Sequence, residues 1–266
     1  MVIELHQLTA ALYLAASLTT FVGLALPSSP LGRAAIWLLA AAAIGHGLAF
    51  AQLHALVPPP PLTDLPLAVS LMAWLAVLFV LGLVLLRRRR LESLAGLVAA
   101  LAFVGVFYAS LSLRRTVEGG SEPVGGWPHL HVILASAGIA LLGVAGLAGL
   151  LFLAEDRRLR AKRRLEWVRG LPSLEALDRV NLLALALGFP LLTFGVVAGM
   201  LWTEDMTGQL WAGGAHATWS ALAWAIYLAL AVARFGVGWR GREAAASAAA
   251  GFAFLLFAVI GVGIAA

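Results

Sequence analysis

The sequence holds six histidines and no cysteine, so imidazole is the side chain best suited to bind a metal or a cofactor. The absence of cysteine excludes disulfides, thiolate metal sites and covalent Cys-x-x-Cys-His haem attachment within this sequence. A noncovalently bound haem is still compatible with a sequence that lacks cysteine. No Walker loop, dinucleotide fingerprint, His-Glu-x-x-His zinc motif or Gly-x-Ser-x-Gly elbow occurs. The histidines are His6, His46, His54, His129, His131 and His216.

His46 lies in the stretch "AAAIGHGLAFAQLH", 13 residues beyond Arg33. At 1.5 Å per residue this spacing places it about 20 Å along a helix, deep within an apolar run. An ionisable residue at that depth must face a bundle interior and have a partner. Gly45 and Gly47 beside it leave room for a flat ligand or for tight helix packing around a histidine bonded to a backbone carbonyl. Both interpretations stay open.

His54 follows eight residues later, about 12 Å further along the same helix. It cannot share one metal with His46. The proline-rich stretch after it, "ALVPPPPLTDLP", predicts that His54 is solvated at a membrane interface.

His129 and His131 open an apolar run in "WPHLHVILASAG". Residues two apart on a helix point about 200° away from each other, so only one of them can face the bundle. Trp127 and Pro128 are typical of an interfacial anchor and a helix start.

His216 lies in "WAGGAHATW", in the first turn of another apolar run, with Trp219, Ser220 and Ala223 on its face. This position puts it at the same depth as His131. Two neutral imidazoles at one level can ligate a haem iron axially, between flat walls of tryptophan. The alternative is an ordinary aromatic belt at the membrane surface.

The elements that carry these residues are membrane spans. The chain is 62% hydrophobic and 12% charged, with a mean hydropathy of +0.96, which excludes an ordinary soluble domain. Runs of about 20 apolar residues cross a hydrocarbon core, and short connections predict one all-α bundle and a single domain over residues 1–266. The eight predicted transmembrane helices cover residues 7–26, 34–56, 66–86, 92–112, 129–153, 180–202, 216–235 and 244–265.

Basic residues alternate between the connections. One set of loops carries 16 of the 18 Lys and Arg, and the other set carries only Arg114 and Arg115. The positive-inside rule then predicts both termini outside, in the periplasm or extracellular space, and the basic loops, including 87–90 and 157–169, in the cytoplasm. We expect the membrane to be a bacterial inner membrane. The net charge of +5 follows from this sidedness and indicates a lipid partner, with no nucleic acid. No basic leader precedes the first run, so we expect it to be a permanent span.

Five segments in order resemble the cytochrome c assembly superfamily of haem-handling membrane proteins, the CcsA/ResC type, and its short eight-span YpjD/HemX-like branch. They are "IGHGLAFAQLH", "PLTDLPLAVSLMAWL", "LHVILASAGIALLGVAGLAGLLFLAEDRRLRAKRR", "LPSLEALDRVNLLALALGFPLLTFGVVAGMLW" and "WSALAWAIYLALAVARFGVGWRGR".

The resemblance implies noncovalent haem b, with His46 as a ligand within a span and His131 as the first outer-face ligand. The family's Trp-rich WWD motif falls on residues 208–224, where Trp211, Trp219 and Trp224 keep their places. Its Trp-Asp pair is replaced by Gly213-Gly214.

Other departures concern the ligands. His216 stands where the family usually has Lys, and we interpret it as a substitute ligand. The family's second span histidine falls at Val232, and the second outer histidine is missing because the sequence ends at "GVGIAA". The resemblance therefore implies a haem-binding or haem-handling protein, without the complete synthase activity, that works with other membrane subunits or cytochrome biogenesis proteins. Arg114 and Arg115 are equally compatible with contacts to haem propionates and with plain solvation.

Two alternatives stay open. One is a membrane-anchored regulator or scaffold of tetrapyrrole synthesis, as in HemX, with "EDRRLRAKRRLEWVRGLPSLEALDR" as its contact surface. That segment also fits an interfacial helix on anionic lipid. The other is a structural subunit of a larger membrane complex.

Overall fold

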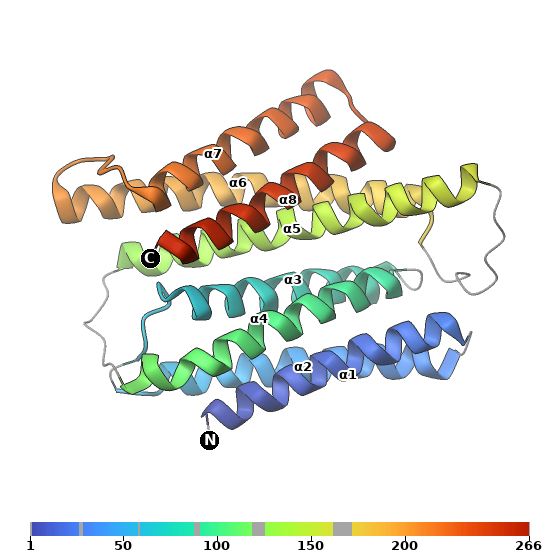
Figure 1. Cartoon of the computed structure of the whole chain (residues 1–266), viewed down its shortest axis with the longest axis horizontal. Helices are drawn as coiled ribbons and strands as arrows, with labels where there is room; N and C mark the ends of the chain where they lie inside the picture. The colour runs from blue at the N-terminus through green and yellow to red at the C-terminus, as the bar shows by residue number, and fades with distance from the viewer. Residues whose placement is uncertain are drawn as a thin grey trace. The chain divides into compact units, whose positions relative to one another are not determined.

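The described residues form helices joined by loops (Figure 1). The computed structural model describes residues 2–26, 29–57, 59–87, 91–118, 126–161 and 172–265, and no strand occurs among them. These residues confirm the predicted all-α class. The α-helices are α1 (Val2–Ala25), α2 (Ser29–His54), α3 (Leu65–Arg87), α4 (Glu92–Glu118), α5 (Gly126–Arg160), α6 (Leu174–Thr207), α7 (Ala215–Ala231) and α8 (Arg242–Ala265), and a π-helical segment, η2 (Val232–Val237), continues α7.

Seven of these helices, α1 to α6 and α7 with η2, are long and apolar enough to cross a membrane. The chain is therefore a multi-pass membrane protein. The crossing of α8 and the sidedness of the chain stay predictions. Of the basic loops, residues 88–90 and 162–171 lie outside the described part of the chain, as do the side chains of Arg114 and Arg115.

Helices α5 and α6 extend well beyond the predicted spans, because polar residues continue the helix past the apolar run. At the end of α5, Arg158 pairs with Glu155 and Arg160 pairs with Asp156 at 3.0 Å. Such pairs three or four residues apart stabilise a helix in water. Hydropathy alone predicts the apolar part of a helix and does not predict these charged ends.

The described residues fall into two compact units. Unit 1 comprises Met1–Val124 with Lys162–Ser173, and unit 2 comprises Gly125–Ala161 with Leu174–Ala266. Helices α1 to α4 form the first, and α5 to α8 form the second. The single domain over the whole length stays a prediction.

In unit 1, α1 packs against α2 and α4, and α3 packs against α4 and α2. The buried face of α1 is unusually polar, with His6, Thr9, Tyr13, Ser17 and Thr20 at intervals of three or four residues. The hydroxyls of Thr9 and Thr20 donate to carbonyls of their own helix at 2.8 Å. They are thereby satisfied without a partner on another helix.

In unit 2, α5 packs against α6 and α8, and α7 packs against α8 and α6. Small residues bring α5 and α6 together. A Cβ on Gly138 would lie 2.5 Å from the backbone nitrogen of Leu192, and one on Gly195 would lie 2.7 Å from that of Ala135. Glycine at such positions lets two helix backbones approach closely, and this contact fixes α6 beside the first turns of α5.

An ion pair between the buried Arg234 of η2 and the partly buried Asp178 joins α6 to the segment between α7 and α8. The guanidinium of Arg234 donates to both carboxylate oxygens of Asp178, at 3.0 and 2.9 Å, and to the carbonyl of Trp239 at 2.9 Å. Asp178 also accepts the backbone N–H of Gly241 at 3.0 Å. The π-helical turn that contains Arg234 directs its side chain inward.

Candidate functional site

His131 on α5 and His216 on α7 lie side by side at one end of unit 2. Their ring centroids are 6.0 Å apart and the ring planes differ by 74°. Both line a cavity of about 170 Å³ with residues from the end of α6 and from the loop before α7. Trp202, Thr203, Trp211 and Ser220 are among the other lining residues.

The hydrogen bonding of His131 determines which ring nitrogen is available. Its Nδ1 lies 2.8 Å from the carbonyl oxygen of Gly195 on α6. A carbonyl only accepts, so Nδ1 carries the hydrogen and the neutral ring keeps its lone pair on Nε2. Metal-binding histidines are commonly held by such a bond from the other nitrogen, which fixes both tautomer and ring orientation.

His216 is positioned by a turn that needs glycine. Gly213 and Gly214 have φ values of 74° and 92°, in the region that residues with a Cβ rarely adopt. The chain then enters α7 at Ala215, so His216 occupies its first turn, with an exposed side chain. The backbone thus accounts for glycine where the resembling family has a Trp-Asp pair.

The tryptophans divide between the cavity and the helix contacts. Trp211 lines the cavity. Trp219 instead packs against Phe254 and Phe257 of α8, with ring centroids 6.0 and 5.6 Å from its own. Trp224 donates its Nε1–H to the Thr193 hydroxyl of α6 at 3.1 Å. One of the three tryptophans expected around a ligand therefore reaches the cavity.

Trp202 is a residue of the cavity wall that the sequence does not predict. The centroid of its ring lies 6.1 Å from that of His131, and the side chain lines the cavity. At the end of an apolar run, a tryptophan is hard to distinguish from an interfacial anchor. On α7, Ser220 lines the cavity with His216, while Trp219 faces α8.

His46 is fully buried in unit 1, and both of its ring nitrogens have hydrogen-bond partners. Nδ1 lies 3.2 Å from the hydroxyl of Tyr13 on α1, and Nε2 lies 2.9 Å from that of Ser70 on α3. Its partners are therefore side-chain hydroxyls and not a backbone carbonyl. The ring of Phe50 stacks on it with centroids 5.2 Å apart.

The two glycines beside His46 face other side chains. A Cβ on Gly45 would lie 3.2 Å from the Thr9 hydroxyl, and one on Gly47 would lie 2.9 Å from the Trp74 ring. The space beside Gly45 and Gly47, where a flat ligand was one of the two interpretations, is therefore occupied by side chains of neighbouring helices.

The remaining predicted residues lie elsewhere. His54 is exposed at the end of α2, and its Nδ1–H donates to the carbonyl of Phe50 at 3.0 Å. His129 lies two residues before His131 on α5 and is half-buried. Of the basic segment expected to contact a partner, residues 162–171 lie outside the described part of the chain.

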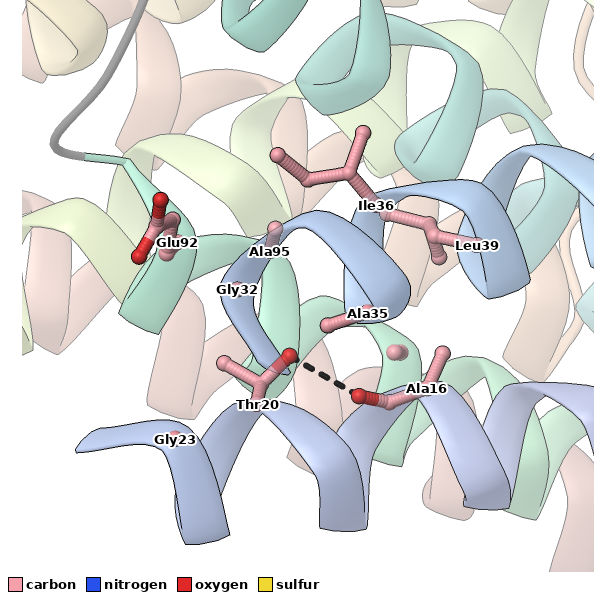
Figure 2. Close-up of a pocket in the computed structure, with 10 residues that line it drawn as sticks. Ala16, Thr20, Gly23, Gly32, Ala35, Ile36, Leu39, Glu92 and Ala95 are labelled. Atoms are coloured by element: carbon pink, nitrogen blue, oxygen red, sulfur yellow. Dashed lines mark hydrogen bonds between the residues drawn. The ribbon is translucent and has the colours of Figure 1, made fainter. Parts of the chain in front are cut away.

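A second cavity lies in unit 1, between α1, α2 and α4 (Figure 2). Its volume is about 30 Å³, and its walls carry mainly Ala16, Ala35, Leu39 and Ala95, with Glu92 at its edge. The hydroxyl of Thr20 donates to its own helix there. A space of this size holds one or two waters, so it is too small for a cofactor.

The paired imidazoles of unit 2 suit a metal that brings its other ligands with it. Among the described residues there is no group of three or more His, Cys, Asp or Glu that could hold a bare ion. Each metal–imidazole bond is about 2 Å long, so two ligating nitrogens lie about 4 Å apart and their ring centroids about 6 Å apart. A porphyrin iron needs only two axial ligands, and the 6.0 Å between the ring centroids of His131 and His216 is compatible with such a pair.

Comparison with known proteins identifies the family of this chain. A family model described as Cytochrome C assembly protein matches residues 124–266, which is more than half of the chain and includes all of unit 2. The chain belongs to this family. The match includes α5 to α8 and therefore both His131 and His216.

Curated members of the family include the cytochrome c biogenesis proteins CcsA. The Chlamydomonas reinhardtii protein is 27% identical over 212 residues, which cover 76% of this chain and 58% of that protein. The Microcystis aeruginosa protein is 38% identical over 88 residues, 33% of this chain and 27% of the relative. The Picosynechococcus protein is 38% identical over 90 residues, 34% of this chain and 27% of the relative. This chain is thus a membrane protein related to cytochrome c biogenesis that matches less than two thirds of these relatives' length.

Proposed function

We propose that the chain binds haem b noncovalently in the cavity of unit 2, with Nε2 of His131 and a ring nitrogen of His216 as axial ligands. The observation that carries this proposal is the 6.0 Å separation of the two rings across a shared cavity. The hydrogen bond from His131 to Gly195 supports it, because this bond leaves Nε2 as the basic nitrogen. Haem bound there would supply an iron centre whose potential depends on both imidazoles.

The cavity walls fit part of a porphyrin. Trp202 and Trp211 offer flat apolar surfaces, and Met200 and Val196 add aliphatic surface. The volume of about 170 Å³ is below the roughly 300–1,000 Å³ of sites that enclose a whole ligand. Part of the macrocycle would therefore lie outside, against the loop in which Leu210 and Trp211 are about half exposed. An accessible edge suits a protein that passes haem on.

The proposed role is haem handling in cytochrome c biogenesis, without the complete synthase reaction. We place the chain in the short, eight-span branch of the family, in a bacterial inner membrane, with the cavity and both termini on the outer side. The absence of a histidine at Val232 supports the limited role, because the resembling synthases have a ligand there. His46 is bonded to two hydroxyls, so the proposal rests on unit 2.

The optical spectrum of the purified full-length protein, with and without added haemin, tests this function. We expect a Soret band and the α and β bands typical of two imidazole ligands after reduction. His131→Ala should abolish them, and His216→Ala should shift the spectrum to a single-imidazole form. His54→Ala is the matched control, because His54 is an exposed histidine of unit 1. Spectra that are the same in the wild type and the His131→Ala variant would overturn the proposal.

A further inference from the structure

The helices of the two units pack in the same order. In unit 1, α1 lies against α2 and α4, and α3 lies against α4 and α2. In unit 2, α5 to α8 make the same contacts in the same chain order. Many membrane proteins are built from two internal repeats, and matching residues at matching places identify such copies.

The third helix of each unit carries the same pattern, Ser-x-x-Ala-Trp. It begins at Ser70 in α3 and at Ser220 in α7, so corresponding residues lie 150 positions apart in the sequence. Both patterns start five residues into their helix, because α3 begins at Leu65 and α7 at Ala215. The two helices therefore have the same register.

The second helix of each unit follows with the same shift. The Nε1–H of Trp74 donates to the carbonyl of Ala43 on α2 at 2.8 Å, and that of Trp224 donates to the hydroxyl of Thr193 on α6 at 3.1 Å. Ala43 and Thr193 are again 150 residues apart. The same tryptophan thus joins the third helix to the second at the same place in both units.

A glycine two residues later marks the contact with the first helix. A Cβ on Gly45 would lie 3.2 Å from the Thr9 hydroxyl of α1, and one on Gly195 would lie 2.7 Å from the backbone nitrogen of Ala135 on α5. These glycines share the shift of 150 residues. One shift that holds for a sequence pattern, a hydrogen bond and a helix contact indicates that the two units are copies of one four-helix fold.

The copies differ where unit 2 has its cavity. Val196 and Met200 of α6 line that cavity, and at the same shift α2 carries His46 and Phe50. The ring of His6 on α1 lies 6.3 Å from each of these two rings, measured between centroids. The imidazole of His46 therefore fills, in unit 1, the place that is open to a ligand in unit 2.

The partner of that imidazole shows how unit 2 can hold a ligand. Nε2 of His46 lies 2.9 Å from the hydroxyl of Ser70. Its counterpart Ser220 lines the cavity of unit 2, and the Ser220 hydroxyl has no hydrogen-bond partner among the described residues. Thr203, the other lining residue with a hydroxyl, donates to the carbonyl of Gly199 in its own helix at 2.9 Å, a common arrangement in helices. Ser220 is therefore the hydroxyl of this wall that is left for a ligand.

We propose that a ligand in unit 2 takes the place of the His46 ring and accepts a hydrogen bond from the Ser220 hydroxyl. This inference rests on the haem binding proposed above and names a further contact in the same site. In a haem whose iron has two imidazole ligands, the pyrrole nitrogens are all coordinated, so the propionate carboxylates are the groups that accept hydrogen bonds. Ser220 therefore donates to a propionate oxygen, and a hydrogen bond to a charged acceptor is stronger than one between neutral groups.

The test compares haemin with its dimethyl ester, in which both carboxylates are esterified and uncharged. Each is titrated into the purified full-length chain in detergent and followed at the Soret band. Ser220→Ala should weaken haemin binding by about ten- to a hundredfold and ester binding by much less. Ser247→Ala is the matched control, because the Ser247 hydroxyl donates to the carbonyl of Ala244 in its own helix at 3.0 Å. Equal haemin affinity of the wild type and Ser220→Ala would overturn the proposal, as would an equal loss for both ligands.

Val196→His tests the correspondence between the two units. An imidazole at this position should reach Ser220 as His46 reaches Ser70. It should then fill the cavity and lower haemin affinity while the thermal midpoint stays unchanged. Val197→His is its control, because Val197 is 47% exposed and is not among the lining residues. Wild-type haemin affinity in Val196→His would overturn the proposal.

These titrations also separate the Ser220 contact from haem binding itself. No haemin uptake by the wild type would overturn both. Uptake that depends on His131 and not on Ser220 or Val196 would overturn the contact alone.

Discussion

Gly199 on α6 leaves the space into which the ring of His131 on α5 fits. A Cβ at Gly199 would lie 2.7 Å from Nδ1 and 2.9 Å from Cε1 of that ring. One turn earlier, Gly195 supplies the carbonyl that accepts the ring hydrogen. Two glycines four residues apart therefore hold one imidazole in place, one by its backbone oxygen and the other by its missing side chain.

Gly199→Ala should therefore displace the imidazole of His131 while leaving the helices folded. We expect haem affinity to fall by about ten- to a hundredfold, the usual effect of disturbing the support of a metal ligand. The measurement is haemin titration followed at the Soret band. Gly143→Ala is the control on α5, because a Cβ there would meet only Phe252, at 3.7 Å. Equal titrations of the two variants would contradict the role of Gly199.

His46→Ala should lower stability whatever its effect on haem. The substitution leaves the buried hydroxyl of Ser70 and the hydroxyl of Tyr13 without their partner and opens a cavity beside Phe50. The expected loss is about 2–4 kcal/mol in the free energy of unfolding. Thermal unfolding in detergent, read alongside haem content, measures it. Unchanged stability with lost haem would instead support a direct haem ligand.

The sequence predicted the helices well because the thickness of the hydrocarbon core dictates a run of about 20 apolar residues. It predicted equal depths for His131 and His216 from the same rule. Depth along a helix says nothing of the angle around it, and on α7 this angle separates Ser220, which lines the cavity, from Trp219, which packs on α8.

Contacts between helices cannot be predicted from the sequence in the same way. Nothing in the sequence indicates that His6, near the start of the chain, lies beside His46, because this contact exists only where α1 packs on α2. One signal was present in the sequence. His6, Thr9, Tyr13, Ser17 and Thr20 repeat every three or four residues in an otherwise apolar helix, and such a polar stripe must face the inside of a bundle.

Arg234→Ala should destabilise unit 2 strongly, because it leaves the carboxylate of Asp178 partly buried beside the α7–α8 turn without its cation. The Arg234 side chain is 5% exposed and that of Asp178 is 26% exposed. We expect a loss of about 3 kcal/mol in the free energy of unfolding. Arg179→Ala breaks an exposed pair with Glu175 in the same helix and should cost less than about 0.5 kcal/mol. Equal thermal midpoints for the two variants would show that the buried pair contributes little.

The predicted sidedness is checked by reporter fusions. A reporter that is active only outside the cytoplasm, fused after Ala266, should be active, and the same reporter inserted after residue 165 should be silent. The reason is the division of 16 basic residues against two between alternate connections. The opposite pattern would place the cavity of unit 2 on the cytoplasmic side.

Gly214→Ala should separate the geometry of the loop from the chemistry of the histidines. Gly214 has φ of 92°, and a Cβ there would meet nothing within 4 Å, so the cost is conformational and not steric crowding. With ψ at 167° the residue lies in an extended region that is essentially restricted to glycine, so a residue with a Cβ pays about 1–3 kcal/mol there, and α7 can avoid the cost by starting one residue later. His216 would then leave its place beside His131, while His131 keeps its bond to Gly195. We therefore expect Gly214→Ala to bind haem with the single-imidazole spectrum of His216→Ala, although all six histidines are present. Gly236→Ala is the control in the same unit, because a Cβ there would make one ordinary contact, with Val232 at 3.7 Å. A two-imidazole spectrum in Gly214→Ala would show that the loop does not position His216.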